Sequence, residues 1–233
     1  MLHGAQKGMF ELSFDLPADC ARRLALNQAD IGIAPSAVLP ELGLEVIRGA
    51  GIAARGAVRS ILLISKTPIA GIGTLALDSS SRTSVLLARI ILRDRYGVTP
   101  RCVTMAPDAA AMLQAADAAL LIGDPALRID PHQAPHTALD LAEEWLRLTG
   151  LPMVFAVWAA RREVITAEIE QAFQDSARYG AEHLEDIVAC ESQARGFSPE
   201  FVRHYLTRNV VNQLNDLDYQ GLRRFLELAA TLP

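Results

Sequence analysis

A cluster of hydroxyl side chains around one arginine lies at residues 78–84, with the sequence Asp-Ser-Ser-Ser-Arg-Thr-Ser. The apolar residues before it predict a buried strand at 73–77, and those after it predict a helix that begins at 81. A helix N-terminus carries unpaired N–H groups and a partial positive charge, so it favours a bound anion. The cluster therefore predicts a carboxylate or phosphate site formed by Ser80, Ser81, Arg82, Thr83 and Ser84. The alternative is that Asp78 or a serine merely caps the helix.

A second set of candidate residues follows from an internal repeat. Residues 23–33 resemble residues 111–121, because each segment combines a helix end, a small residue, an aspartate and a short apolar strand. Two such units suggest two lobes of similar build, and such folds bind ligands at the carboxyl ends of their strands. Ser36 follows the first repeated strand, and Gly123 and Asp124 follow the second. The alternative is that both segments are ordinary helix–strand joints of a doubly wound sheet.

Few side chains qualify as a general base. Asp124 is the candidate catalytic residue, since a carboxylate at the end of a strand could accept or relay a proton; its alternative role is to cap the following turn. His132 and His136 have helical spacing, but neighbouring prolines interrupt a helix there, so no metal site is predicted. Glu143 and Glu144 lie on a predicted amphipathic helix, where carboxylates are usually solvated.

The elements that must position these side chains alternate between strands and helices as far as about residue 160. The pattern predicts strands at 10–14, 30–34, 44–47, 58–65, 73–77, 101–105, 118–122 and 153–158. It predicts helices at 17–26, 81–96, 107–114, 138–148, 163–179, 181–194, 199–206 and 220–230. Alternating units of this kind predict an α/β fold with a mostly parallel sheet that helices cover.

The composition limits the class of protein. The 233 residues carry a net charge of −5, and the basic residues are scattered among acidic ones, which argues against a nucleic-acid partner. There is no apolar run of about 18 residues, so no membrane partner is predicted. Residues 1–8 lack the apolar core of a signal peptide, and three separated cysteines are typical of a reducing compartment. We therefore expect a cytoplasmic protein.

Six segments resemble the chorismate dehydratase (MqnA) family, which acts in menaquinone biosynthesis by the futalosine pathway. They are 28–36, 58–65, 77–84, 120–127, 140–145 and 149–158. The more specific matches are the hydroxyl cluster at 81–84 and Gly-Asp-Pro-Ala-Leu at 123–127. The resemblance implies a two-lobed, periplasmic-binding-protein-like (type II) α/β fold with a ligand cleft between the lobes. Lobe I would comprise residues 1–67 and 157–233, and lobe II residues 68–156.

The resemblance also implies a reaction. Members of the family are lyases that remove water from chorismate and form 3-[(1-carboxyvinyl)oxy]benzoate without a metal or other cofactor. The expected partner is thus a small molecule with two carboxylates, which need two anion sites. We assign residues 80–84 to one site, and Ser36 and Ser60, on the facing lobe, to the other end of the substrate. The substrate's own carboxylate is the alternative to Asp124 as the base.

The N-terminus departs from the family pattern. Members usually begin with a strand that ends in a loop bearing serine or asparagine. Residues 2–4 of this chain resemble the helix end that follows this loop. We therefore expect the first strand of lobe I to be absent.

Two other functions stay open at this point. A second enzyme of the same pathway, 1,4-dihydroxy-6-naphthoate synthase, shares the fold but tends to carry a histidine where this chain has Gly123 and Asp124. A solute-binding protein for an organic anion would also share the fold. Such a protein would need a signal peptide, which residues 1–8 do not provide.

Overall fold

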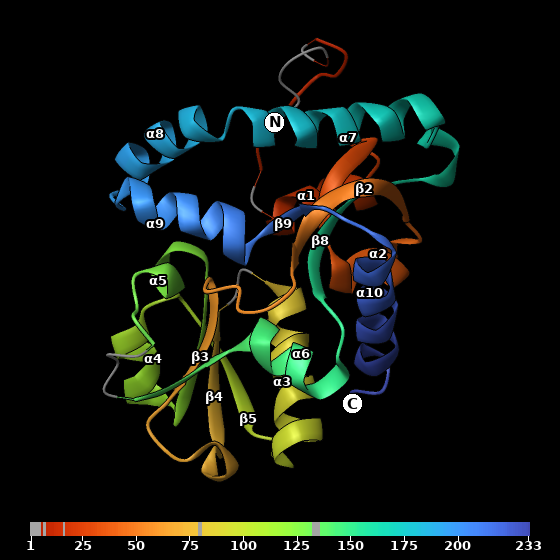
Figure 1. Cartoon of the computed structure of the whole chain (residues 1–233). Coiled ribbons are helices and arrows are strands. Elements are labelled where there is room, and N and C mark those ends of the chain that lie inside the picture. Colours follow the sequence, from red (N-terminus) through yellow and green to blue (C-terminus); the bar gives the residue numbers. More distant parts are fainter. Residues whose placement is uncertain (1–5, 7, 16, 79–80, 132–135) are drawn as a thin grey trace. The chain divides into compact units, whose positions relative to one another are not determined.

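The computed structural model describes residues 6, 8–15, 17–78, 81–131 and 136–233 (Figure 1). The chain divides into two compact units. Unit 1 combines the chain up to Ala53 with Val154–Tyr219, and unit 2 combines Ala54–Met153 with Gln220–Pro233. Among the described residues, no helix is long and apolar enough to cross a membrane.

A five-stranded sheet forms the centre of unit 2, in the order β5-β4-β6-β3-β7. Its strands are β3 (Ile61–Ser65), β4 (Thr74–Asp78), β5 (Arg101–Met105), β6 (Ala118–Ile122) and β7 (Thr137–Asp140). Strand β4 runs parallel to β5 and β6, whereas β3 runs antiparallel to β6 and β7. Every residue of β3 is buried, as expected for a strand that is covered on both faces of the sheet.

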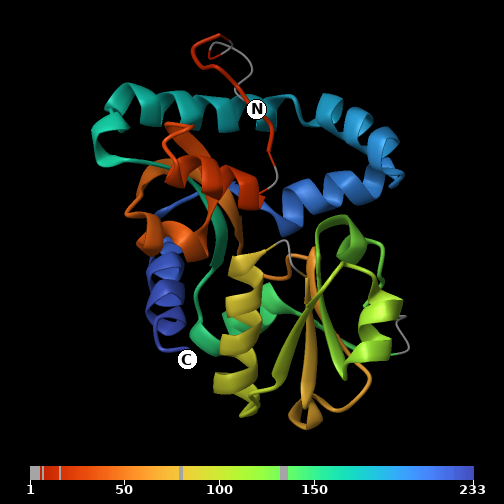
Figure 2. The same cartoon turned by 180° about the vertical axis from the view of Figure 1, so that it is seen from behind.

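Helices cover both faces of this sheet. The helices of unit 2 are η3 (Ile69–Gly71), α3 (Arg82–Tyr96), α4 (Ala109–Ala115), α5 (Gly123–Leu127), α6 (Leu141–Thr149) and most of α10 (Asp216–Ala229). The two cartoon views place α3 and α4 on opposite faces (Figure 2). Met112 of α4 packs with Leu62 and Leu121 in one core cluster. Trp145 of α6 meets Phe225 of α10 edge to face, with ring centroids 6.1 Å apart.

Unit 1 has a four-stranded sheet in the order β1-β8-β2-β9. The strands are β1 (Ile31–Pro35), β2 (Glu45–Ala54), β8 (Met153–Ala160) and β9 (Val211–Gln213). The other elements are α1 (Pro17–Ala25), η2 (Ser36–Val38), α2 (Leu39–Leu42), η4 (Arg162–Val164), α7 (Ala167–Glu182), α8 (Leu184–Arg195), α9 (Pro199–His204) and a π-helical turn, η5 (Tyr205–Asn209). Phe173 of α7 packs on Trp158 and Phe10 in the core of this unit.

Parts of the predicted secondary structure and the predicted strand directions differ from the structure. Residues 137–140 form strand β7, where the sequence predicted the start of a helix. Residues 11–15 are exposed and form no strand, and the preceding Phe10 instead buries its ring against Phe173. The sheets are mixed rather than mostly parallel: β5, β4 and β6 run parallel, but β1 pairs antiparallel with β8, and β2 pairs antiparallel with β9. The predicted helix end at residues 2–4 lies outside the described residues.

The division of the chain also differs from the expected lobes. Strand β3 was expected in lobe I, but it pairs with β6 and β7 and so belongs to unit 2. The chain from Gln220 onwards, expected to pack on the first lobe, also belongs to unit 2. Its helix approaches the backbone closely: a Cβ atom on Gly221 would lie 1.9 Å from the carbonyl oxygen of Pro152. This approach requires glycine at that position.

Candidate functional site

The strand register brings several predicted site residues to the end of the unit 2 sheet at which β4 and β6 terminate, and we call this end the edge that carries the site. Leu77 near the end of β4 pairs with Leu120 of β6, and Ile61 at the start of β3 pairs with Ile122 at the end of β6. Asp140, at the end of β7, pairs with Leu62. The segments that follow β4, β6 and β7 and the one that precedes β3 therefore lie at the same edge. They contain Ser60, Ser81, Arg82, Thr83, Ser84, Gly123, Asp124 and Asp140.

The hydroxyl cluster forms the N-terminus of α3. Ser81 is the N-cap, and its Oγ accepts a hydrogen bond from the backbone N–H of Ser84 at 3.2 Å. The Ser81 hydroxyl also lies 3.0 Å from the Ser84 hydroxyl. Thr83 and Ser84 are buried, whereas Arg82 is exposed. Ser81 and Ser84 thus form the helix cap, which is the alternative role that the sequence allowed. The anion site stays a prediction, and Ser80 lies outside the described residues.

Ser60 and Gly123 hold the neighbouring segments together. The backbone N–H of Gly123, which has a φ of +63°, donates to the carbonyl oxygen of Ser60 at 2.8 Å. Asp124, half-buried, is the second residue of α5. Gly123 therefore links the segment that carries Asp124, the predicted catalytic residue, to the segment that carries Ser60.

Ser36 lies elsewhere. It follows β1 in unit 1 and is fully buried, and its Oγ donates to the carbonyl oxygen of Val154 at 2.7 Å. The sequence assigned Ser36 and Ser60 to the same lobe, but Ser60 belongs to unit 2 because it precedes β3. The role of Ser36 as a ligand contact stays a prediction.

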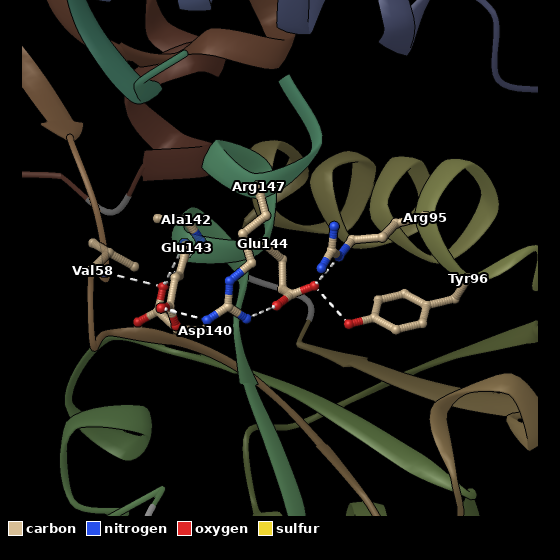
Figure 3. A network of polar contacts seen from close by, with 8 residues as sticks. All are labelled: Val58, Arg95, Tyr96, Asp140, Ala142, Glu143, Glu144 and Arg147. Atoms are coloured by element: carbon tan, nitrogen blue, oxygen red, sulfur yellow. Dashed lines mark hydrogen bonds and ion pairs between the residues drawn. The ribbon is translucent and has the colours of Figure 1, made fainter. Parts of the chain in front are cut away.

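Asp140 shapes this edge in a way that the sequence did not reveal. Its Oδ1 caps α6 by accepting from the backbone N–H groups of Ala142 at 3.0 Å and Glu143 at 3.2 Å. The same carboxylate accepts from the N–H of Val58 at 3.1 Å (Figure 3). Through Oδ2 it also accepts from the N–H of Arg59 at 2.6 Å. Burial raises the pKa of Asp140, and the four N–H groups oppose this shift. One side chain thus fixes both α6 and the turn before Ser60.

A second polar network lies between α3 and α6. Glu144 is buried, contrary to the prediction of a solvated carboxylate. It accepts hydrogen bonds from Arg95 Nε, Tyr96 Oη and Arg147 Nη1, each at 2.6 Å (Figure 3). Burial raises the pKa of Glu144, but the bonds from Tyr96, Arg147 and Arg95 outweigh burial and hold this pKa below its ordinary value. The network fixes α3, whose N-terminus carries the hydroxyl cluster.

The fold is that of the periplasmic binding proteins. Protein AF1704 from Archaeoglobus fulgidus is similar with a TM-score of 0.70 and 19% identity, over 93% of this chain and 84% of that one. The periplasmic aliphatic sulphonate binding protein SsuA from Escherichia coli has a TM-score of 0.61 and 16% identity, over 92% of this chain and 74% of that one. At these identities the likeness shows the fold alone, and it confirms the expected α/β fold class.

The chain belongs to the menaquinone biosynthesis family, whose sequence model matches residues 1–231. A relative from Thermus thermophilus, a chorismate dehydratase, is 29% identical over 236 aligned residues. This alignment covers 94% of the present chain and 86% of the relative. The family resemblance drawn from the sequence segments is therefore confirmed.

Proposed function

We propose that this protein is a chorismate dehydratase, a lyase that converts chorismate to 3-[(1-carboxyvinyl)oxy]benzoate and water. The observation that carries the proposal is the alignment of a chorismate dehydratase over 94% of a chain that belongs to the menaquinone biosynthesis family. The sheet edge of unit 2 offers fitting chemistry. It combines the capped N-terminus of a 15-residue helix with buried hydroxyl groups, and such a helix start attracts carboxylates.

The proposed reaction removes a proton and a hydroxide from the substrate ring. They leave together as water, and the ring becomes aromatic. In this proposal a carboxylate of chorismate binds at the start of α3, beside the side chains of Thr83 and Ser84 and the positive end of the helix. Asp124 takes or relays the proton. The carboxylate of the substrate itself is the alternative base.

We further propose that the protein acts in the cytoplasm. All three cysteines, Cys20, Cys102 and Cys190, are free thiols in the structure. Free thiols are typical of proteins in a reducing compartment, where disulfides do not persist.

The direct test is to incubate the purified protein with chorismate and to identify the product by mass spectrometry and NMR. We expect a product that has lost one water and contains an aromatic ring. Binding of chorismate without its consumption would contradict the proposal and favour a solute-binding protein.

A matched variant tests the place of binding. Thr83→Val keeps the side-chain shape and removes the hydroxyl. If this hydroxyl contacts the substrate, kcat/KM falls by a factor of about ten, from the loss of a hydrogen bond of about 1 kcal/mol or more. Thr99→Val is the control, because Thr99 is exposed and precedes β5, at the opposite edge of the sheet from the hydroxyl cluster. An unchanged kcat/KM in Thr83→Val would remove this hydroxyl from the site.

A further inference from the structure

Arg59 has an unusual backbone conformation. Its φ is +66°, in the left-handed region that residues other than glycine rarely adopt. The carboxylate of Asp140 holds this conformation, because it accepts the N–H groups of both Val58 and Arg59. Strained backbone of this kind persists where the surroundings fix it, and it is concentrated at functional sites. The strained backbone positions the side chain of Arg59, which is therefore a candidate functional group.

The guanidinium of Arg59 is incompletely paired. Its Nη2 donates to the carbonyl oxygen of Ile129 at 3.1 Å. Its Nη1 is enclosed, yet it finds no hydrogen-bond partner among the described residues. Among the residues that the structure describes, no carboxylate lies within ion-pair distance of Arg59. A buried hydrogen-bond donor without an acceptor costs free energy. The described residues supply no acceptor for Nη1, so a bound molecule that supplies one would remove this cost.

The position of Arg59 makes a ligand the natural acceptor. It directly precedes Ser60, whose carbonyl oxygen is bound by the N–H of Gly123 at the end of β6. Its guanidinium reaches Ile129, two residues beyond the end of α5. Both contacts belong to the sheet edge that carries the predicted site residues. An arginine is always charged and binds carboxylates through paired donors, so it suits a dianionic substrate.

We propose that Arg59 is a substrate-binding residue that pairs with one carboxylate of the substrate through Nη1, which is enclosed in this structure and becomes uncovered as the substrate binds. This inference rests on the proposed function and deepens it, since it gives the site a cation besides Arg82. The turn formed by Val58 and Arg59, held by Asp140, positions the guanidinium before the substrate arrives. Binding then supplies the missing acceptor.

Two readouts test the inference. The first is the steady-state kinetics of Arg59→Gln and Arg59→Lys with chorismate. Loss of a charge-assisted contact raises KM about tenfold or more in Arg59→Gln with a smaller change in kcat, and Arg59→Lys recovers part of the loss. Arg101→Gln is the matched control: Arg101 is exposed at the start of β5, at the opposite edge of the same sheet, and we expect its KM to be unchanged. An unchanged KM in Arg59→Gln would overturn the inference.

The second readout needs no turnover. Benzoate, a carboxylate that cannot react, should raise the Tm of the wild-type protein and of Arg101→Gln but not that of Arg59→Gln. Loss of this Tm shift in Arg59→Gln supports the inference, whether or not the wild-type protein consumes chorismate. A wild-type protein that does not consume chorismate would overturn the proposed function alone. An equal shift in Arg59→Gln, or no shift in the wild-type protein, would overturn the inference. Should Arg59→Gln fail to fold, Arg59→Gly answers the same question, because glycine adopts the left-handed backbone without strain.

Discussion

Two charged groups of unit 2, Glu144 and Arg59, meet opposite environments. Glu144 receives hydrogen bonds from three side chains, which use both of its oxygens. Arg59 has one carbonyl partner and one enclosed nitrogen without an acceptor among the described residues. A buried charge that is fully paired stabilises the positions of its neighbours, whereas a buried donor without an acceptor is costly and favours a ligand that supplies one. Glu144 thus serves the fold, whereas Arg59 is the group that we propose for binding.

The largest effect is expected when the paired charge is removed. Glu144→Ala leaves Arg95, Tyr96 and Arg147 without their shared acceptor. We expect a loss of about 3 kcal/mol in unfolding free energy, which corresponds to a fall of roughly 6–12 °C in Tm. Thermal unfolding followed by circular dichroism measures this fall. Benzoate binding to the folded protein, corrected for the unfolded fraction, should not change.

The control for this variant is its neighbour. Glu143 pairs with Arg147 at 2.7 Å, but both side chains are about half exposed, at 44% and 50%. Exposed pairs contribute about 0–1 kcal/mol, so Glu143→Ala should lower Tm little. Equal losses in the two variants would break the distinction between a paired buried charge and a surface pair.

A smaller effect is expected when the support of Arg59 is altered. In Asp140→Asn the remaining oxygen can still cap α6, but the amide nitrogen faces the N–H of Arg59 in place of Oδ2. We expect a loss of about 2 kcal/mol in stability from the missing hydrogen bond. We also expect a higher KM for chorismate, because Arg59 loses its fixed position. Asp108→Asn is the matched control, since Asp108 caps α4 through Oδ1 alone among the described residues.

Replacement of Arg82 should change substrate affinity and leave stability nearly unchanged, in contrast to the replacement of Glu144. Because its side chain is exposed, Arg82→Ala should leave Tm nearly unchanged. If it pairs with a carboxylate, KM for chorismate rises about tenfold, equivalent to about 1.4 kcal/mol. Arg101→Ala serves as control at the opposite edge of the sheet. A normal KM in Arg82→Ala would leave Arg59 as the cation that binds the substrate.

The smallest effect concerns pH. The pKa of Glu144 is lower in the folded protein than in the unfolded chain, so its ionised form contributes stability above the unfolded value of about 4.3. This contribution disappears as the pH falls through the lower pKa of the folded state. Wild-type stability should therefore fall more steeply below about pH 4.3 than that of Glu144→Gln. Parallel curves of unfolding free energy against pH would show that folding does not lower the pKa of Glu144.

Local sequence patterns were sufficient for the elements that depend on neighbouring residues. The hydroxyl cluster and the apolar run that follows it correctly predicted α3, because caps and periodicity are local properties. The six segments led to the right family and fold class. Gly123 and Asp124 were correctly placed at the end of a strand, since β6 is a short apolar run.

Long-range pairing explains what the sequence did not predict. Asp140 lies more than 80 residues along the chain from the turn that it binds. The residue types of Val58-Arg59-Ser60 do not predict the left-handed backbone of Arg59, because none of them is glycine. Glu144 is acidic on an amphipathic helix, and its burial depends on Arg95 and Tyr96 of another helix. The division of the chain depends on the strand partners of β3, which a single sequence does not reveal. Burial beside an unusual φ would be the signal for residues such as Arg59, and both require coordinates.

The shared carboxylate of Asp140 has a consequence for the motions of the native state. Because one side chain holds the first turn of α6 and the turn before β3, neither can open without loosening the other. We therefore expect the amides of Arg59 and Ala142, which are distant along the chain, to exchange in one cooperative opening event. A fluctuation that frays the first turn of α6 releases the backbone of the arginine, and a ligand that holds the arginine slows hydrogen exchange in the helix.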